Sequence, residues 1–205
     1  MESLRWVLAS GSPRRQSLMR LFGKPFEVHP AQIEEHLPPR VPRPALLGRQ
    51  LARAKAEAVA LYYTNALIIA ADTLVVIDGR VLGKPADARE AHEMLRLLSG
   101  RTHTVITALC LLLRREGRTV RLVQDAPRSR VTFRPLSDAW IRWYIATGEP
   151  FDKAGAYGIQ EYGALLIEKV QGCYFNVVGL PLATLAQRLE ELGLWSPTDA
   201  TAQVK

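Results

Sequence analysis

One carboxylate, Asp72, lies in the middle of the most apolar stretch of the chain, residues 67–77. An ionised carboxylate that is withdrawn from water needs a cation or hydrogen-bond donors beside it, because its desolvation is otherwise very costly. Five apolar or small residues precede Asp72, and more apolar residues follow Thr73. An aspartate that only fixes a turn would have more polar neighbours. The pattern therefore favours a functional acid.

Two basic segments could supply its partner. Residues 10–15, SGSPRR, form a small-residue turn that opens a helix. Free backbone N–H groups, the helix dipole and two guanidinium groups can there bind an anion together. Further along, Lys84 stands on a rigid bend between Gly83 and Pro85. A buried acid with basic groups at loop positions indicates a site for a metal ion and phosphates, although the spacing of residues 10–15 equally suits a well-capped helix with surface arginines.

Other polar residues are weaker candidates. Glu34 and Glu35, at the edge of a Pro-rich loop, could add a carboxylate for an octahedral cation, or they could be solvated loop charges. Lys55 lies within an Ala-rich helical pattern, whose spacing favours a surface lysine over a ligand. In the segment 152–160, small residues surround Tyr157, and the Gln160 amide can both donate to and accept from the edge of a base. A tight packing turn is the alternative.

The composition sets outer limits on fold and function. A chain of 205 residues with 48% hydrophobic residues is long enough for one full core, with room for two lobes around a cleft. The net charge of +7 favours anionic partners, but it does not separate nucleotides from nucleic acid or a membrane surface. Cys110 and Cys173 match no disulfide or zinc pattern. With no signal peptide and no apolar run near the ~20 residues of a membrane span, we expect a protein of the reducing cytoplasm.

Periodicity and turn signals predict the elements that must position these residues. Helices are expected over residues 13–22 with Ser12 as N-cap, 45–62, 87–98, 137–146 and 182–192, and strands over residues 4–9, 26–29, 67–77, 103–114, 119–133 and 164–170. The Pro-rich residues 30–44 are expected to form a loop. Strands and helices mix without strict alternation, which predicts one α/β domain over residues 1–195, followed by a disordered tail over residues 196–205.

Several of these motifs together resemble the Maf family of nucleoside triphosphate pyrophosphatases. They run in the family's order and spacing from about Leu4 to Leu192, as LASGSPRR at 8–15, ADT at 71–73, LGKP at 82–85, LSG at 98–100, DKAGAYGIQ at 152–160 and VGLPL at 178–182. The resemblance implies an α/β fold in which a mixed twisted sheet with flanking helices forms two lobes around a deep cleft, similar to the inosine triphosphate pyrophosphatases. It also implies hydrolysis between the α- and β-phosphates to a nucleoside monophosphate and pyrophosphate.

The resemblance also implies roles for individual residues. Arg14, Thr73 and Gln160 match the positions that mark the dTTP/UTP branch, where the 7-methyl-GTP branch carries Trp, Gln and Glu. The implied phosphate-binding residues are Ser10, Arg14, Arg15, Lys55 and Lys84, the implied proton acceptor is Asp72, and the implied ligands of Mg²⁺ or Mn²⁺ are Glu34 and Asp72. The chain departs from the family pattern at Gln32, Ala70 and Glu161. Asp72 could act as a base or as a metal ligand.

The expected partner is a nucleoside triphosphate, with no membrane and no nucleic acid, and a homodimer is an expectation from the family. Two other functions are kept as alternatives. One is hydrolysis of 7-methyl-GTP by the same fold. The other is a non-enzymatic protein whose basic surface contacts nucleic acid or a division-associated partner. The latter ranks lower because the chain lacks an aromatic-basic stacking platform and a clear recognition helix.

Overall fold

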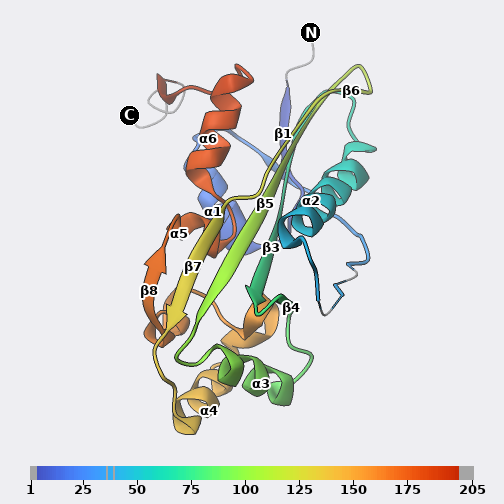
Figure 1. Ribbon diagram of the computed structural model, residues 1–205. Helices are drawn as coiled ribbons and strands as arrows, with labels where there is room; N and C mark the ends of the chain where they lie inside the picture. The colour runs from blue at the N-terminus through green and yellow to red at the C-terminus, as the bar shows by residue number, and fades with distance from the viewer. Residues whose placement is uncertain (1–3, 36, 39, 199–205) are drawn as a thin grey trace.

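A mixed β-sheet forms the centre of the protein, as a computed structural model of residues 4–35, 37–38 and 40–198 shows (Figure 1). In this part of the chain the sheet has eight strands in the order β2-β1-β3-β5-β7-β8, with β4 paired to β3 and β6 to β5. The strands are β1 Arg5–Leu8, β2 Glu27–Val28, β3 Ala66–Ile77, β4 Arg80–Leu82, β5 Thr102–Arg115, β6 Arg118–Asp125, β7 Arg128–Phe133 and β8 Ile167–Gln171. β1 runs parallel to β2 and β3, and the other pairs are antiparallel.

Helices cover both faces of the sheet and one of its ends. The α-helices are α1 Pro13–Arg20, α2 Pro44–Ala60, α3 Ala88–Leu98, α4 Asp138–Ala146, α5 Tyr174–Val178 and α6 Leu182–Glu191, and the 3-10 helices are η1 Glu149–Asp152, η2 Ala154–Ala156 and η3 Glu161–Leu166. α1 and α6 pack on one face, α2 packs on the other, and α3 and α4 form a second lobe at the far end (Figure 1). None of the described helices is both long and apolar enough to cross a membrane.

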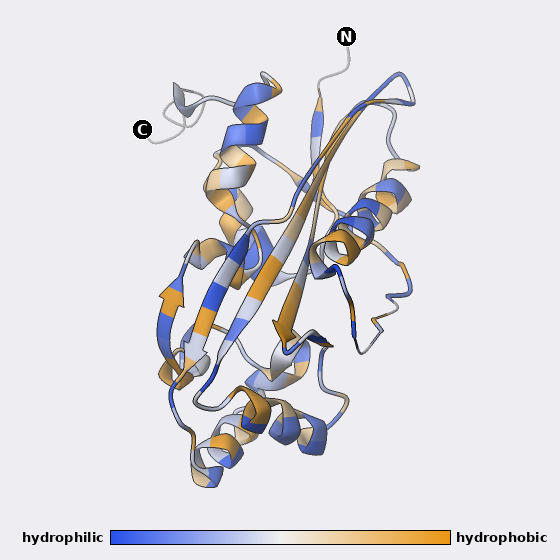
Figure 2. Cartoon of the chain, viewed as in Figure 1, coloured by the Kyte–Doolittle hydropathy of each residue, from blue (hydrophilic) through white to orange (hydrophobic). Residues whose placement is uncertain are grey.

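The central strands β3 and β5 are buried on both faces, which explains their unbroken apolar sequences. Side chains alternate along β3, so Leu67 and Ile69 contact the α1–α6 layer while Ile68 and Ala70 contact the α2 layer. Figure 2 shows the apolar residues that run along β3 and the upper part of β5. Continued beyond Ala70, the same alternation directs residue 72 toward α2 and residue 73 toward α1.

β3 has an open edge in its middle. β1 pairs with β3 as far as Ile69, and β4 begins to pair with it at Val75. Between these points, residues 70–74 are paired to β5 alone among the described strands. The chain leaves β1 at this level and turns through residues 9–12 into α1. Asp72 therefore lies at a gap in the sheet, where a ligand can reach β3 from its edge.

The structure confirms the mixed α/β fold and most of the predicted elements. Ser12 caps α1 as predicted, with its hydroxyl oxygen 3.5 Å from the Arg15 amide nitrogen. The strand predicted over 164–170 begins only at Ile167, because residues 161–166 form the 3-10 helix η3. The strand predicted over 119–133 is two strands, interrupted before Arg128, and β4 and α5 were not predicted. Of the predicted tail, residues 199–205 lie outside the described residues.

Candidate active site

A cavity of about 370 Å³ lies at the gap in the sheet, between the two lobes. A second hollow of about 360 Å³ adjoins it in front of the N-terminus of α1. Of the residues predicted from sequence, those lining the main cavity are Arg14, Arg15, Lys55, Asp72, Thr73, Lys84 and Gln160. Ser10 lines the adjoining hollow, and Glu34 lines neither. One strand edge, two helices and two loops thus bring distant residues into one site.

Asp72 is buried and pairs with a lysine from α2. Its side chain is 6% exposed, and its Oδ1 accepts a hydrogen bond from Lys55 Nζ at 2.5 Å. Lys55 Nζ also lies 2.7 Å from Glu35 Oε1, although only 11% of the lysine side chain is exposed. The expectation of a surface lysine at position 55 is therefore wrong. The alternation of β3 directs Asp72 toward α2, where a cation must offset its desolvation.

Arg15 is partly buried on the opposite side of β3. Its Nε donates to the Gly179 carbonyl at 2.8 Å, Nη1 to Ser10 Oγ at 3.1 Å and Nη2 to Thr73 Oγ1 at 3.0 Å. Burial lowers the pKa of Arg15, while the charge of Asp72 acts in the opposite direction. The guanidinium group therefore ties α1, β3 and the loop after α5 together, and it places a fixed positive charge in the cavity wall.

A chain of hydroxyl groups links Thr73 to α5. Thr107 Oγ1 donates to the Asn176 carbonyl at 2.6 Å and lies 3.0 Å from Thr73 Oγ1. Because the single hydroxyl hydrogen of Thr107 is used by Asn176, Thr73 must be the donor to Thr107. Thr73 Oγ1 can then accept from Arg15, which only donates. In the structure, Thr73 therefore holds Arg15 in place, and its role in substrate choice stays a prediction.

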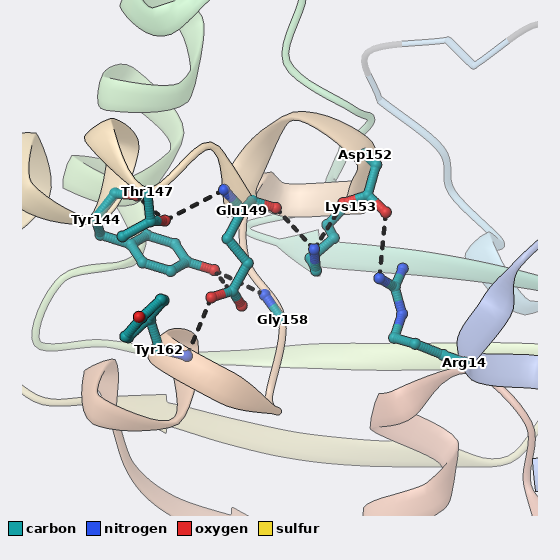
Figure 3. A network of polar contacts seen from close by, with 8 residues as sticks. All are labelled: Arg14, Tyr144, Thr147, Glu149, Asp152, Lys153, Gly158 and Tyr162. Carbon is teal, nitrogen blue, oxygen red and sulfur yellow. Dashed lines mark hydrogen bonds and ion pairs between the residues drawn. The ribbon is translucent and has the colours of Figure 1, made fainter. Parts of the chain in front are cut away.

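Arg14 contacts a carboxylate at the mouth of the cavity (Figure 3). Its Nη1 lies 3.3 Å from Asp152 Oδ2, and Asp152 Oδ1 accepts from Lys153 Nζ at 2.6 Å. Burial acts to raise the pKa of Asp152, but Lys153 and Arg14 outweigh it and hold the pKa below its usual value. The pair joins α1 of one lobe to η1 of the other.

The sequence indicates Glu35 as a candidate beside Glu34 but assigns the metal to Glu34, and it gives Asp152 and Lys153 no role, although Glu35, Asp152 and Lys153 all line the cavity. Nothing in the sequence distinguishes Glu35 from its neighbour, because both follow the same proline-rich loop pattern and only the loop conformation decides which side chain faces Lys55. Glu34 is exposed and lines neither hollow. Asp152 and Lys153 begin the segment chosen for its small residues, and the charges themselves were a signal that could have been used. In the described part of the chain, no three His, Cys, Asp or Glu side chains cluster as a metal site.

Lys84 and Gln160 approach the cavity from two loops of the second lobe. The loop that carries Lys84 is fixed to η2, because the Gly155 N–H donates to the Gly83 carbonyl at 2.9 Å. Gln160 lies just before η3, and its side-chain amide makes no hydrogen bond to the described residues. Apolar residues complete this half of the wall; they are Leu74, Val75, Val105, Ile159, Val177 and Val178.

Tyr157 also lines the cavity and is supported from behind by a buried histidine. His103 Nε2 lies 2.6 Å from Tyr157 Oη, and Phe133 packs edge-on against both rings. His103 is 2% exposed, and its Nδ1 has no hydrogen-bond partner in the described residues. Burial lowers the pKa of His103 to about 4. The histidine is thus a neutral packing residue.

The fold and the site define a class of α/β proteins with a cavity lined by basic side chains at an open strand edge. The chain belongs to the Maf family: the model described as "Maf-like protein" matches residues 5–192. It is 50% identical over 188 residues to a protein of Moorella thermoacetica, covering 92% of this chain and 95% of that one. It is 48% identical to a protein of Carboxydothermus hydrogenoformans, covering 93% of this chain and 100% of that one. Both relatives are named dTTP/UTP pyrophosphatase.

A third relative, the dTTP/UTP pyrophosphatase of Symbiobacterium thermophilum, is 48% identical over 187 residues and covers 91% of this chain and 93% of its own. A crystal structure of the nucleoside-triphosphatase / dITP/XTP pyrophosphatase of Mycobacterium abscessus aligns with 93% of this chain and 97% of its own. Its identity is 14% and its TM-score is 0.44, a similarity too low to support an argument. The family resemblance seen in the motifs is confirmed by the family model and the relatives.

The depressed pKa of His103 predicts a pH dependence of stability. Between pH 6.5 and about 4 the unfolded chain binds a proton that the folded protein excludes, so the free energy of unfolding falls as the solution is acidified. From pH 7 to pH 4.5 this residue should account for a loss of about 2 to 3 kcal/mol. Urea denaturation of wild type and His103→Gln at both pH values measures it. The variant should lose less stability than wild type by that amount, and an equal loss in both proteins would contradict the prediction.

Proposed function

We propose that this protein hydrolyses dTTP and UTP, and modified pyrimidine triphosphates of the same shape, to the nucleoside monophosphate and pyrophosphate. The observation that carries the proposal is the polarity of the cavity. Arg14, Arg15, Lys55 and Lys84 also line the adjoining hollow, whereas Gln160 and the valines and isoleucine of the wall line the main cavity alone, so the cavity has a basic end and an apolar end. Relatives about 50% identical over most of the chain bear the name dTTP/UTP pyrophosphatase, which supports the same substrate.

The basic end suits a triphosphate. Arg14 and Lys84 reach the cavity from opposite lobes, and the first turn of α1 adds backbone N–H groups. Charge that develops on the departing pyrophosphate can be offset by Arg15 and Lys55 without rearrangement, since both are already fixed by hydrogen bonds. The protein therefore contributes mainly by positioning the reacting groups and by the electrostatic field of its fixed charges.

The other end suits a nucleobase. The valines and isoleucine of the wall can contact a flat ring, and the free amide of Gln160 can donate to and accept from its edge. In this proposal Gln160 reads the pyrimidine directly. Thr73 and Arg14, the other two positions that mark the dTTP/UTP branch, act at the phosphate side, Thr73 through the arginine that it holds.

Asp72 is the residue assigned to the attacking water. Lys55 binds Oδ1, and Oδ2 makes no hydrogen bond to the described residues, so it is available to accept from a water at the open edge of β3. In-line attack of this water on the α-phosphorus would break the bond to the leaving pyrophosphate and pass a proton of the water to Asp72. Both roles of Asp72 are compatible with this geometry.

A divalent cation fits the carboxylates at this end. Asp72 Oδ1 and Glu35 Oε1 both contact the ammonium group of Lys55, which holds the two carboxylates close to each other. Two carboxylates with phosphate oxygens and water provide the hard octahedral shell that Mg²⁺ or Mn²⁺ requires. Such an ion would polarise phosphoryl oxygens and lower the pKa of a bound water. The geometry favours Glu35 as the second ligand in place of Glu34, which was predicted from sequence.

We also propose a reducing compartment, the cytoplasm, since Cys110 and Cys173 are free thiols in the structure. The homodimer expected from the family stays a prediction.

The substrate proposal is tested by assaying dTTP, UTP and 7-methyl-GTP side by side with Mg²⁺ and measuring pyrophosphate release. The expected result is efficient release from dTTP and UTP and far less from 7-methyl-GTP. Preference for 7-methyl-GTP would move the protein to the other branch of the family. Release from none of them, together with salt-sensitive binding to duplex DNA, would instead favour a non-enzymatic binding protein.

Asp72→Asn should lower kcat for dTTP by about 10²- to 10⁴-fold, because a neutral amide neither accepts the proton nor binds a cation well. The matched control is Asp78→Asn, which makes the same change in an exposed turn where Asp78 pairs with Arg101. It should retain wild-type kcat. Near-full activity in Asp72→Asn would remove both proposed roles of this acid.

Neighbouring acids in one loop provide a test of the cation site. Glu35→Gln should raise the Mg²⁺ concentration needed for half-maximal activity by about 10-fold or more, whereas Glu34→Gln should leave it unchanged. Binding of Mn²⁺ followed by electron paramagnetic resonance gives the same comparison without turnover. A larger effect at Glu34 would return the assignment to the ligand predicted from sequence.

A further inference from the structure

The loop that carries Gln160 is folded back tightly on itself. A Cβ placed on Gly163 would lie only 2.0 Å from the Gly158 carbonyl oxygen, so the two ends of the loop are in backbone contact. Glu161 adopts a positive φ of 53°, a conformation that few L-residues take without support. Gln160 therefore lies at the bend of a constrained loop, and something outside the loop must keep it in this shape.

That support is a buried tyrosine–glutamate pair beneath the loop (Figure 3). Tyr144 Oη donates to Glu149 Oε1 at 3.0 Å and accepts from the Gly158 N–H at 3.1 Å. Glu149 Oε2 accepts from the Tyr162 N–H at 3.1 Å. The backbone amides two residues before and two residues after Gln160 are thus bound to one pair of side chains.

Burial of the Glu149 carboxylate carries a high desolvation cost. Glu149 is 9% exposed, and its carboxylate has no cation within ion-pair distance in the described residues. Lys153, the nearest candidate in Figure 3, bonds the Glu149 carbonyl and not the carboxylate. An apolar side chain would pack here at a lower desolvation cost, so what the carboxylate adds is two acceptors in fixed places. Burial raises the pKa of Tyr144, which keeps its hydroxyl group neutral and able to donate.

We propose that Tyr144 and Glu149 are positioning residues that hold Gln160 against the base of the substrate. The inference rests on the proposed function, because it takes Gln160 as the residue that reads the base. Neither residue lines the cavity, so each acts through the loop and not on the nucleotide. Glu149 also begins η1, the turn that ends at Asp152, the partner of Arg14. One short segment thus supports both the base-reading loop and a contact at the phosphate end.

A double-mutant cycle on the full chain tests the proposal. Gln160→Ala should lower kcat/KM for dTTP, and Tyr144→Phe and Glu149→Gln should each lower it by about 10-fold, mainly through KM. In the Gln160→Ala background each of these changes should cost less than about 2-fold, because the side chain that they position is already gone. Full, independent losses in both backgrounds would overturn the proposal, since a general loss of structure lowers activity whether or not Gln160 is present.

Controls separate the possible reasons for failure. Tyr63→Phe removes a half-buried hydroxyl bonded to Glu27 far from this loop and should leave kcat/KM unchanged. Thermal unfolding of each variant reports its folding; should Tyr144→Phe not fold, Glu149→Gln still tests the proposal, because its amide can accept only one of the two bonds. A wild-type protein that does not hydrolyse dTTP or UTP refutes the proposed function. If the wild type hydrolyses dTTP and Gln160→Ala does so equally well, this inference alone is refuted.

Discussion

The buried ion pair between Asp72 and Lys55 is the interaction on which the rest of the site depends. A carboxylate on a doubly covered strand is tolerable only if a cation meets it, and here the cation comes from α2. The alternation of β3 then sends the next side chain, Thr73, to the opposite layer, where it meets Arg15. Two adjacent residues at one gap in the sheet therefore determine where both flanking helices must deliver positive charge.

Features of the site that depend on local sequence can be predicted, whereas those that depend on contacts between distant segments cannot. Asp72 was found because a charge in an apolar run is anomalous in sequence, and α1 was found because capping is local. Lys55 was misjudged because helical periodicity defines the faces of α2 but does not reveal that one of them lies over an acid. The choice between Glu34 and Glu35 depends on the path of a proline-rich loop, which has no periodic signal.

The short helix α5 shows how unpredicted structure can support predicted chemistry. Its residue Asn176 is fully buried, and its side chain bonds the Thr107 amide, the Val105 carbonyl and Ser129. Because Thr107 in turn holds Thr73, the orientation of Arg15 is set through β5 and α5 on the same face of the sheet. A network in which every member is satisfied favours one arrangement over all others. The rigid arginine in the cavity wall is its result.

The contact between Arg14 and Asp152 has a different character, because it is accessible to solvent. The Asp152 side chain is 62% exposed, so an ion pair of this kind is worth at most about 1 kcal/mol. It is strong enough to keep a long, flexible side chain extended across the entrance, yet weak enough to be exchanged for a ligand that carries several negative charges. Asp152 thus orders the Arg14 side chain before a ligand binds, so Arg14 loses less conformational entropy when it binds a polyanion. Because the ion pair is weak, the ligand can readily replace Asp152 as the partner of Arg14.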